Sequence, residues 1–337
     1  MTGAQAENVL EICGLRTSFL AGSKRAVVVD DLSFNLRKGE ILGIVGESGS
    51  GKSVTLLSVM GLLPERVAKV EAGSAVFAGR DLIAMPFGGL RDIRGNRVAF
   101  IFQEPMSSFN PVLTVGSQIA EALTAHGLCS QSVAKDRAIS ALQAVQMPEA
   151  DKRFDQYPHE FSGGMLQRAM IAMALACHPE VLIADEPTTA LDVTIQAQVL
   201  QLIRDLRDEQ GMSIILISHD LGVIAEMADR VVVMYGGRKM EEADVFTLFE
   251  DCQHPYTQGL LAANPAFEAM MDASEGAQAR LTEIPGSMPS PLDRASGCNF
   301  APRCSLASKT CSEQRPEERQ IGEGHLIRCW NSGDAND

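Results

Sequence analysis

The string Gly-Glu-Ser-Gly-Ser-Gly-Lys-Ser at positions 46–53 constrains the fold more than any other feature of the chain. It follows an apolar run, Ile41–Val45, and precedes a stretch of helical character that continues through Leu62. Glycines at a strand-to-helix turn let backbone N–H groups close around phosphate oxygens, and the positive helix end favours the bound negative charge. The string in this context predicts a nucleotide site and disfavours the alternative, a glycine-rich turn that binds nothing.

Each position of this string has an expected role. Lys52 is expected to reach the β- and γ-phosphates as a mobile positive charge, and the Ser53 hydroxyl is expected to ligate Mg²⁺. The cradle around the phosphates is predicted to consist of Gly46, Ser48, Gly49, Ser50 and Gly51.

A second apolar run, Val181–Ala184, ends in two acids. Asp185 is suited to hold Mg²⁺ through water, and Glu186 could polarise the attacking water as a general base. The alternative is a solvated strand terminus without chemistry, and the nucleotide string argues against it.

Short β-branched runs alternate with helical stretches, which predicts an α/β domain on a largely parallel sheet. The expected strands are Val9–Cys13, Ile41–Val45, Val98–Phe102, Val181–Ala184, Ile214–Ile217 and Val231–Tyr235. An inserted helical subdomain is expected over about residues 108–178, because no strand pattern interrupts the helical periods there. A further helix is expected along the apolar stripe from Ile195 to Leu206, closed by Gly211. Residues 1–252 are predicted to form the nucleotide-binding domain, and residues 253–337 a small, irregular, Cys-containing extension.

The charge of the chain excludes some partners. It has 29 Lys and Arg against 43 Asp and Glu, a net charge of −14, so phosphate backbones and anionic lipids would repel it. No apolar run approaches the roughly 18 residues of a membrane-spanning helix. We therefore expect no nucleic-acid partner, and membrane contact only through partner proteins.

Four further strings resemble the motifs of the ABC ATPase family. Phe161-Ser162-Gly163-Gly164-Met165 resembles its LSGGQ signature, with Phe161 for Leu and Met165 for Gln at the two ends. Ile217-Ser218-His219-Asp220 resembles its switch-histidine loop, Ala190-Leu191-Asp192 its D-loop, and Gln103 its Q-loop glutamine. The fold implied by the resemblance is a P-loop NTPase, and the ligand implied is ATP with Mg²⁺.

The resemblance implies a head-to-tail pair of nucleotide domains. Ser162, Gly163 and Gly164 would cap the ATP of the partner subunit, and Asp192 would lie near it. His219 would hold the γ-phosphate, and Gln103 would sense Mg²⁺ and the attacking water. Phe19 stands where the family places an aromatic that stacks on adenine, although a core position is an equal alternative.

Three segments are similar to the dipeptide and oligopeptide importers of this family: residues 103–111, 254–257 and 297–304. The resemblance implies an ATP-hydrolysing subunit at the cytoplasmic face of a bacterial inner membrane. Its partners would be a second ATPase subunit, two transmembrane permease subunits and an extracytoplasmic solute-binding protein. The cargo would be di- or oligopeptides, with nickel, glutathione or another small solute as alternatives. A soluble, non-transport ABC ATPase is the less favoured class.

Four of the eight cysteines crowd the C-terminal segment: Cys298, Cys304, Cys311 and Cys329. Four thiolates suit either a tetrahedral Zn²⁺ or a [4Fe-4S] cluster, and disulfides are disfavoured in a reducing cytoplasm. The resemblance to the peptide importers favours the iron-sulfur cluster. Four reduced, structural cysteines are the remaining alternative.

Overall fold

The computed structural model describes residues 7–188, 192–263, 284–294 and 296–332. These residues fall into two compact units. The sheet unit comprises the described parts of Leu10–Leu36, Ile41–Ala84 and Ile217–Asp337, and the helical unit those of Met1–Val9, Arg37–Glu40 and Met85–Leu216.

The sheet unit contains the strand that leads into the glycine-rich string. This strand, β3 (Ile41–Val45), is buried throughout and pairs in parallel with β9 (Arg230–Tyr235), as their unbroken apolar runs predict. Beyond β9 the order continues through β10 (Arg238–Asp244), β12 (His325–Ile327) and β11 (Arg319–Gly322), all antiparallel. Helix α1 (Lys52–Val59) follows β3, and α9 (Leu221–Met227) packs so closely that a Cβ on Gly43 would meet Ile224 at 3.1 Å.

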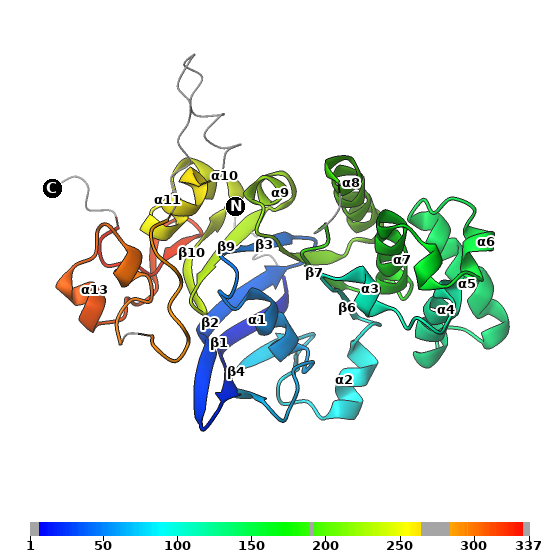
Figure 1. Cartoon of the computed structure of the whole chain (residues 1–337), viewed down its shortest axis with the longest axis horizontal. Helices are drawn as coiled ribbons and strands as arrows, with labels where there is room; N and C mark the ends of the chain where they lie inside the picture. Colours follow the sequence, from blue (N-terminus) through cyan, green and yellow to red (C-terminus); the bar gives the residue numbers. More distant parts are fainter. Residues whose placement is uncertain (1–6, 189–191, 264–283, 295, 333–337) are drawn as a thin grey trace, which may run out of the picture. The chain divides into compact units, whose positions relative to one another are not determined.

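A second, four-stranded sheet in this unit has the order β2 (Lys24–Arg37), β1 (Asn8–Ala21), β4 (Ala68–Phe77), β5 (Arg80–Asp81). Its long strands alternate between buried and exposed residues, which is typical of antiparallel strands with one face on the core. Figure 1 shows β1, β2 and β4 in blue beside α1.

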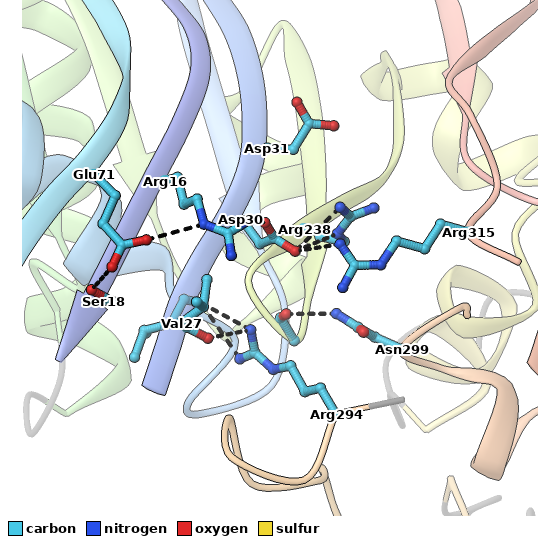
Figure 2. Close-up of polar contacts among 12 residues, drawn as sticks. Arg16, Ser18, Val27, Asp30, Asp31, Glu71, Arg238, Arg294, Asn299 and Arg315 are labelled. Atoms are coloured by element: carbon cyan, nitrogen blue, oxygen red, sulfur yellow. Dashed lines mark hydrogen bonds and ion pairs between the residues drawn. The ribbon is translucent and has the colours of Figure 1, made fainter. Parts of the chain in front are cut away.

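The C-terminal segment of the sheet unit is fastened to the rest of that unit by arginines and by one asparagine (Figure 2). Arg315 of this segment contacts the carboxylate of Asp30 on β2 at 2.8 Å, and the same carboxylate is contacted by Arg238 from β10 at 3.2 Å and by Arg16 from β1 at 2.7 Å. Arg294 donates to the carbonyl of Val27, and Asn299 donates to that of Gly236. The short elements of the segment are α10 (Val245–Glu250), α11 (Pro255–Ala262), η2 (Ala301–Arg303) and α13 (Lys309–Glu313).

The helical unit has three neighbouring strands, β8 (Ser213–Ile217), β7 (Val181–Asp185) and β6 (Val98–Ile101), with β6 and β7 parallel. Its helices are α2 (Phe87–Ile93), α3 (Pro105–Ser108), α4 (Val115–Ala125), α5 (Gln131–Ala144), α6 (Ala150–Phe154), α7 (Gly163–Leu175) and α8 (Val193–Gln210), with the short η1 (Pro158–Glu160). Helix α8 buries the predicted stripe and ends at Gly211, whose φ of 66° suits glycine.

All six strands expected from the sequence are present, and the described residues 108–178 contain helices but no strand. The α/β fold class is confirmed. Among the described residues, no helix has both the length and the apolar composition required to cross a bilayer.

Candidate nucleotide site

The Gly46–Ser53 loop has a backbone that only glycine can adopt at its tight points. Gly46 and Gly51 have φ angles of 150° and 102°. A Cβ on Gly46 would lie 2.1 Å from the carbonyl oxygen of Met234, and one on Gly51 would lie 3.2 Å from that of Val28. The loop is therefore pressed against β9 and β2 within the sheet unit, and its shape is set by those strands.

Polar groups of the loop are arranged for an anionic ligand. Lys52 opens α1, and its ammonium donates to the carbonyls of Gly46 and Glu47 at 2.7 and 3.1 Å, so its charge lies over the loop. The Ser50 hydroxyl is buried and has no hydrogen-bond partner among the described residues. Ser48 and Gly49 are exposed, and Ser53 is half-buried on α1. A phosphate would satisfy the Ser50 hydroxyl and replace the carbonyls around Lys52.

Glu47 of the loop is contacted by residues of the C-terminal segment, and the sequence did not indicate these contacts. The guanidinium of Arg303 donates to both carboxylate oxygens of Glu47, at 3.0 and 2.8 Å, and the Glu47 N–H donates to the Tyr256 hydroxyl at 2.8 Å. Arg303 and Tyr256 lie within strings that carry the importer resemblance, but no spacing rule links them to the loop. The Glu47–Arg303 contact spans 256 positions.

The two predicted acids lie at the end of β7 in the helical unit: Asp185 is its last residue and Glu186 follows it. Asp185 is buried, and Glu186 has a left-handed backbone with φ 49°, a conformation that costs energy in a residue other than glycine. Gln103 donates to the Glu186 carboxylate at 2.9 Å, so the structure brings these two predicted residues together. The buried amide of Gln167, on α7, donates to the Pro187 carbonyl and ties α7 to the turn after the acids.

The signature-like string forms an exposed helix start. Ser162 caps α7 by accepting from the Met165 N–H at 3.4 Å, and both Ser162 and Gly163 are exposed. They line an open hollow of about 590 Å³ together with Asp192, which caps α8. Ala190 and Leu191 lie outside the described residues. A helix N-terminus with free backbone donors can bind an anion that a partner subunit presents.

Two other predicted residues lie in the sheet unit. His219 is exposed, directly after β8, and the next residue, Asp220, caps α9. Phe19 is half-buried on β1 opposite Ala68 of β4, so one part of its ring remains accessible.

The four C-terminal cysteines line one narrow hollow together with His254 and Trp330. Burial raises the pKa of Cys298 to about 11, and burial also raises the pKa values of Cys304 and Cys329. In the described part of the chain, no three His, Cys, Asp or Glu side chains converge closely enough to hold a single metal ion. The four residues are neighbours, but their sulfur atoms do not form a tetrahedral ion site.

His254 contributes an unpaired donor to this hollow. Burial lowers the pKa of His254 to about 4, so the ring is neutral, and its Nδ1 accepts from the Tyr256 N–H at 3.0 Å. The proton must then be on Nε2, which is buried and has no partner among the described residues. A thiolate or an inorganic sulfide in the hollow would satisfy this donor.

The strand, glycine loop and helix, together with the acids at the end of β7, define a P-loop NTPase. Comparison of structures agrees. A dimeric ATP-binding cassette, in a post-hydrolysis state with ADP and Pi, matches with a TM-score of 0.63 and 26% identity over 70% of this chain and 98% of that one. The structure of cbiO1 from Clostridium perfringens, part of the ABC transporter complex cbiONQ, matches with a TM-score of 0.60 and 24% identity, over 73% of this chain and 92% of that one.

Sequence comparison identifies the family. The ABC transporter family model matches residues 29–189, and the model of the oligopeptide/dipeptide transporter C-terminal region matches residues 240–311. A probable peptide ABC transporter ATP-binding protein of Sinorhizobium fredii is 49% identical over 98% of this chain and 97% of its own. A putative peptide import ATP-binding protein of Brucella abortus is 48% identical over 95% of this chain and 96% of its own. The chain belongs to the ABC transporter family, as an ATP-binding subunit.

Proposed function

We propose that this ABC ATPase energises the import of di- or oligopeptides through a membrane permease. The observation that carries the proposal is the combination, in one chain, of a glycine-built phosphate loop and a C-terminal region of the oligopeptide/dipeptide type. Relatives with peptide-import names match at least 95% of the chain, so the likeness extends well beyond the ATPase core.

The roles of individual residues are part of the proposal. Gly46, Ser48, Gly49, Ser50, Gly51 and Lys52 would surround the phosphates of ATP, and Phe19 would stack on its adenine. Ser53, Asp185 and Gln103 would hold Mg²⁺, which supplies Lewis-acid stabilisation of the phosphoryl oxygens. Glu186 would accept the proton of the attacking water, and its hydrogen bond from Gln103 fixes the direction of the carboxylate. His219 would bind the γ-phosphate oxygens.

The signature string would act on the nucleotide of a second subunit. Ser162 and Gly163 are exposed and Gly164 is half-buried at the start of α7, where the first backbone N–H groups of the helix point out of its end. A triphosphate bound to the partner would receive these donors and so join two subunits, either identical or homologous. Loss of the γ-phosphate after hydrolysis weakens that contact and lets the pair separate.

Glu186→Gln tests the proposed base and the dimer together. A general base contributes about 10²–10⁴-fold to the rate, so ATP turnover should fall by roughly that factor while ATP binding persists. The variant should sediment as an ATP-dependent dimer, and Glu180→Gln, a change in an exposed pair with Arg97, should behave as wild type. Ordinary turnover in Glu186→Gln, or a nucleotide-loaded form that stays monomeric, contradicts the proposal.

We further propose that Cys298, Cys304, Cys311 and Cys329 hold a [4Fe-4S] cluster. Each thiolate of such a cluster binds a different iron, so the four sulfurs stand farther apart than around a single Zn²⁺. That requirement agrees with four cysteines around one hollow without a single-ion site, and the unpaired Nε2–H of His254 suits a sulfur acceptor. Iron, sulfide and zinc analysis after anaerobic purification should find four irons per chain. A preparation with no stoichiometric metal contradicts the proposal, and Cys129→Ser serves as the control.

The proposed location is the cytoplasmic face of a bacterial inner membrane, as a peripheral subunit. The proposed partners are two permease subunits, a second ATPase subunit and an extracytoplasmic solute-binding protein. Affinity purification from detergent-solubilised membranes should recover a polytopic permease, and its absence in repeated purifications counts against a transport role.

A further inference from the structure

A carboxylate stands inside the loop that is expected to bind a polyphosphate. Glu47 directly follows Gly46, and its side chain is 27% exposed. A free negative charge at this position would repel the phosphates, because the interaction between two charges is only partly screened in a half-buried site. The loop therefore needs a group that neutralises Glu47 or directs it away from the ligand.

Arg303 provides this neutralisation. Its side chain is 7% exposed, and one of its nitrogens, Nη1, donates to both Glu47 oxygens. The guanidinium is itself held on the other side, since Nε and Nη2 donate to the carbonyls of Pro285 and Ile284 at 2.8 and 3.1 Å. Burial lowers the pKa of Arg303, but its hydrogen bonds to Glu47 and Tyr235 outweigh this and leave the pKa raised. The charge of Arg303 is therefore permanent.

The backbone of Glu47 is fixed by the same segment. Its N–H donates to the hydroxyl of Tyr256, which is fully buried and packs edge-on against Tyr235 with 4.7 Å between ring centroids. Phe300 contacts both rings, and Arg303 lies over the ring of Tyr235 at 5.7 Å. The main chain and the side chain of Glu47 are thus oriented by Tyr256 and Arg303, two residues outside the glycine string.

We propose that Arg303 is a positioning residue for nucleotide binding, which acts by neutralising Glu47 and directing its carboxylate away from the phosphates. The inference rests on the proposed role of the Gly46–Ser53 loop. It gives the C-terminal segment a function in the ATPase cycle that is separate from any group at the cysteines. Without Arg303, the loop carries an uncompensated negative charge at its entrance.

The test is a double-mutant cycle on the full-length chain, with ATP affinity measured by calorimetry and turnover by phosphate release. Arg303→Ala should raise the Kd and KM for ATP on the order of tenfold, with kcat largely retained at saturating ATP, because the uncompensated Glu47 carboxylate then repels the phosphates. Glu47→Gln removes the charge that Arg303 compensates, so Arg303→Ala in that background should change the Kd less than about threefold. Arg303→Lys, which keeps the charge, should recover most of the affinity.

Two controls separate this mechanism from general damage. Arg315→Ala removes an arginine of the same segment that contacts Asp30, and should leave the ATP Kd unchanged. Lys52→Ala tests the site itself and should abolish binding whether or not the inference holds. An unchanged Kd in Arg303→Ala overturns the inference, as does an equal loss in the Glu47→Gln background. If Arg303→Ala does not fold, Arg303→Gln in both backgrounds gives the same comparison, since Gln removes the charge and keeps much of the side-chain length.

Discussion

Asp30 offers the sharpest test of the charge cluster at which the C-terminal segment contacts the rest of the sheet unit. This carboxylate is 5% exposed and receives three guanidinium groups, from Arg16, Arg238 and Arg315 (Figure 2). Replacement by Asn keeps the volume and one acceptor oxygen but removes the charge. Arg238 and Arg315 then lose their shared counter-ion, whereas Arg16 keeps its contact with Glu71 at 3.2 Å.

The expected loss of stability follows from how exposed each of the three arginines is. Arg16 and Arg315 have 42% and 40% of their side chains exposed, so water replaces much of what they lose, and each accounts for about 0–1 kcal/mol. Arg238 is only 10% exposed, and a buried charge left without its partner costs about 3–5 kcal/mol when the pair is broken completely. Because Asn still accepts a hydrogen bond, we expect Asp30→Asn to lower the free energy of unfolding by about 3 kcal/mol.

The neighbouring residue supplies a matched control. Asp31 is paired with Arg328, its side chain is 56% exposed, and its φ is 55°, a backbone conformation that Asn tolerates well. Asp31→Asn should therefore change the free energy of unfolding by less than about 1 kcal/mol. Urea unfolding followed by circular dichroism gives both values, and an equal loss in the two variants would refute the charge argument.

Acid provides an independent check on Asp30. Burial raises its pKa, but the charges of Arg238, Arg315 and Arg16 more than compensate, so the pKa lies below the ordinary value of 3.8. A lowered pKa means that the unfolded chain binds the proton first, and the stabilisation is complete above pH 3.8 and lost as the pH falls through the folded-state pKa. The difference in the free energy of unfolding between wild type and Asp30→Asn should therefore be constant from about pH 5 to 8, and it should shrink in stronger acid.

Two glycine substitutions test the loop support and the signature separately. Gly237→Ala should destabilise the chain by about 2–4 kcal/mol in urea unfolding, since φ is 79° and the new Cβ would lie 2.0 Å from the Val28 carbonyl oxygen. Gly39→Ala, with φ 73° but no atom within 4 Å, should cost only about 1 kcal/mol, and equal losses would count against the steric argument. Gly163→Ala also meets no atom within 4 Å, so stability should persist while ATP turnover falls on the order of tenfold. Gly88→Ala, equally open, should keep full turnover, and an unaffected Gly163→Ala enzyme would argue against the proposed capping of a partner's nucleotide.

The sequence predicted the parallel core well because buried strands appear as unbroken β-branched runs. Ile41–Val45 and Val181–Asp185 are buried at every position, and local composition alone identifies them. Strand β2 was missed, although its buried Leu32, Phe34 and Leu36 alternate with more exposed residues and carry the signal of a one-sided strand. Strands β11 and β12 are only four and three residues long, too short for any periodicity to appear.

In the candidate site too, contiguous motifs could be recognised in the sequence, whereas contacts between distant residues could not. The glycine loop, the two acids and the signature are each contiguous strings, so their chemistry could be predicted from residue types and order. The contacts of Glu47 with Arg303 and Tyr256 join positions separated by 256 and 209 residues. Only the folded sheet unit brings them together, and nothing in local spacing distinguishes Arg303 from other arginines.

One short turn in the C-terminal segment serves two sites. Residues Ala301–Arg303 form η2, which places Arg303 against the phosphate loop and the next residue, Cys304, in the cysteine hollow. Next to the turn, the ring of Phe300 packs against that of Tyr256, whose hydroxyl accepts from Glu47. His254, which caps α11, lines the same cysteine hollow as Phe300. A displacement of the turn would therefore move the Arg303 guanidinium relative to Glu47. Removal of the extension would therefore leave Glu47 without Arg303 and would take Arg315, one of three arginines, from Asp30.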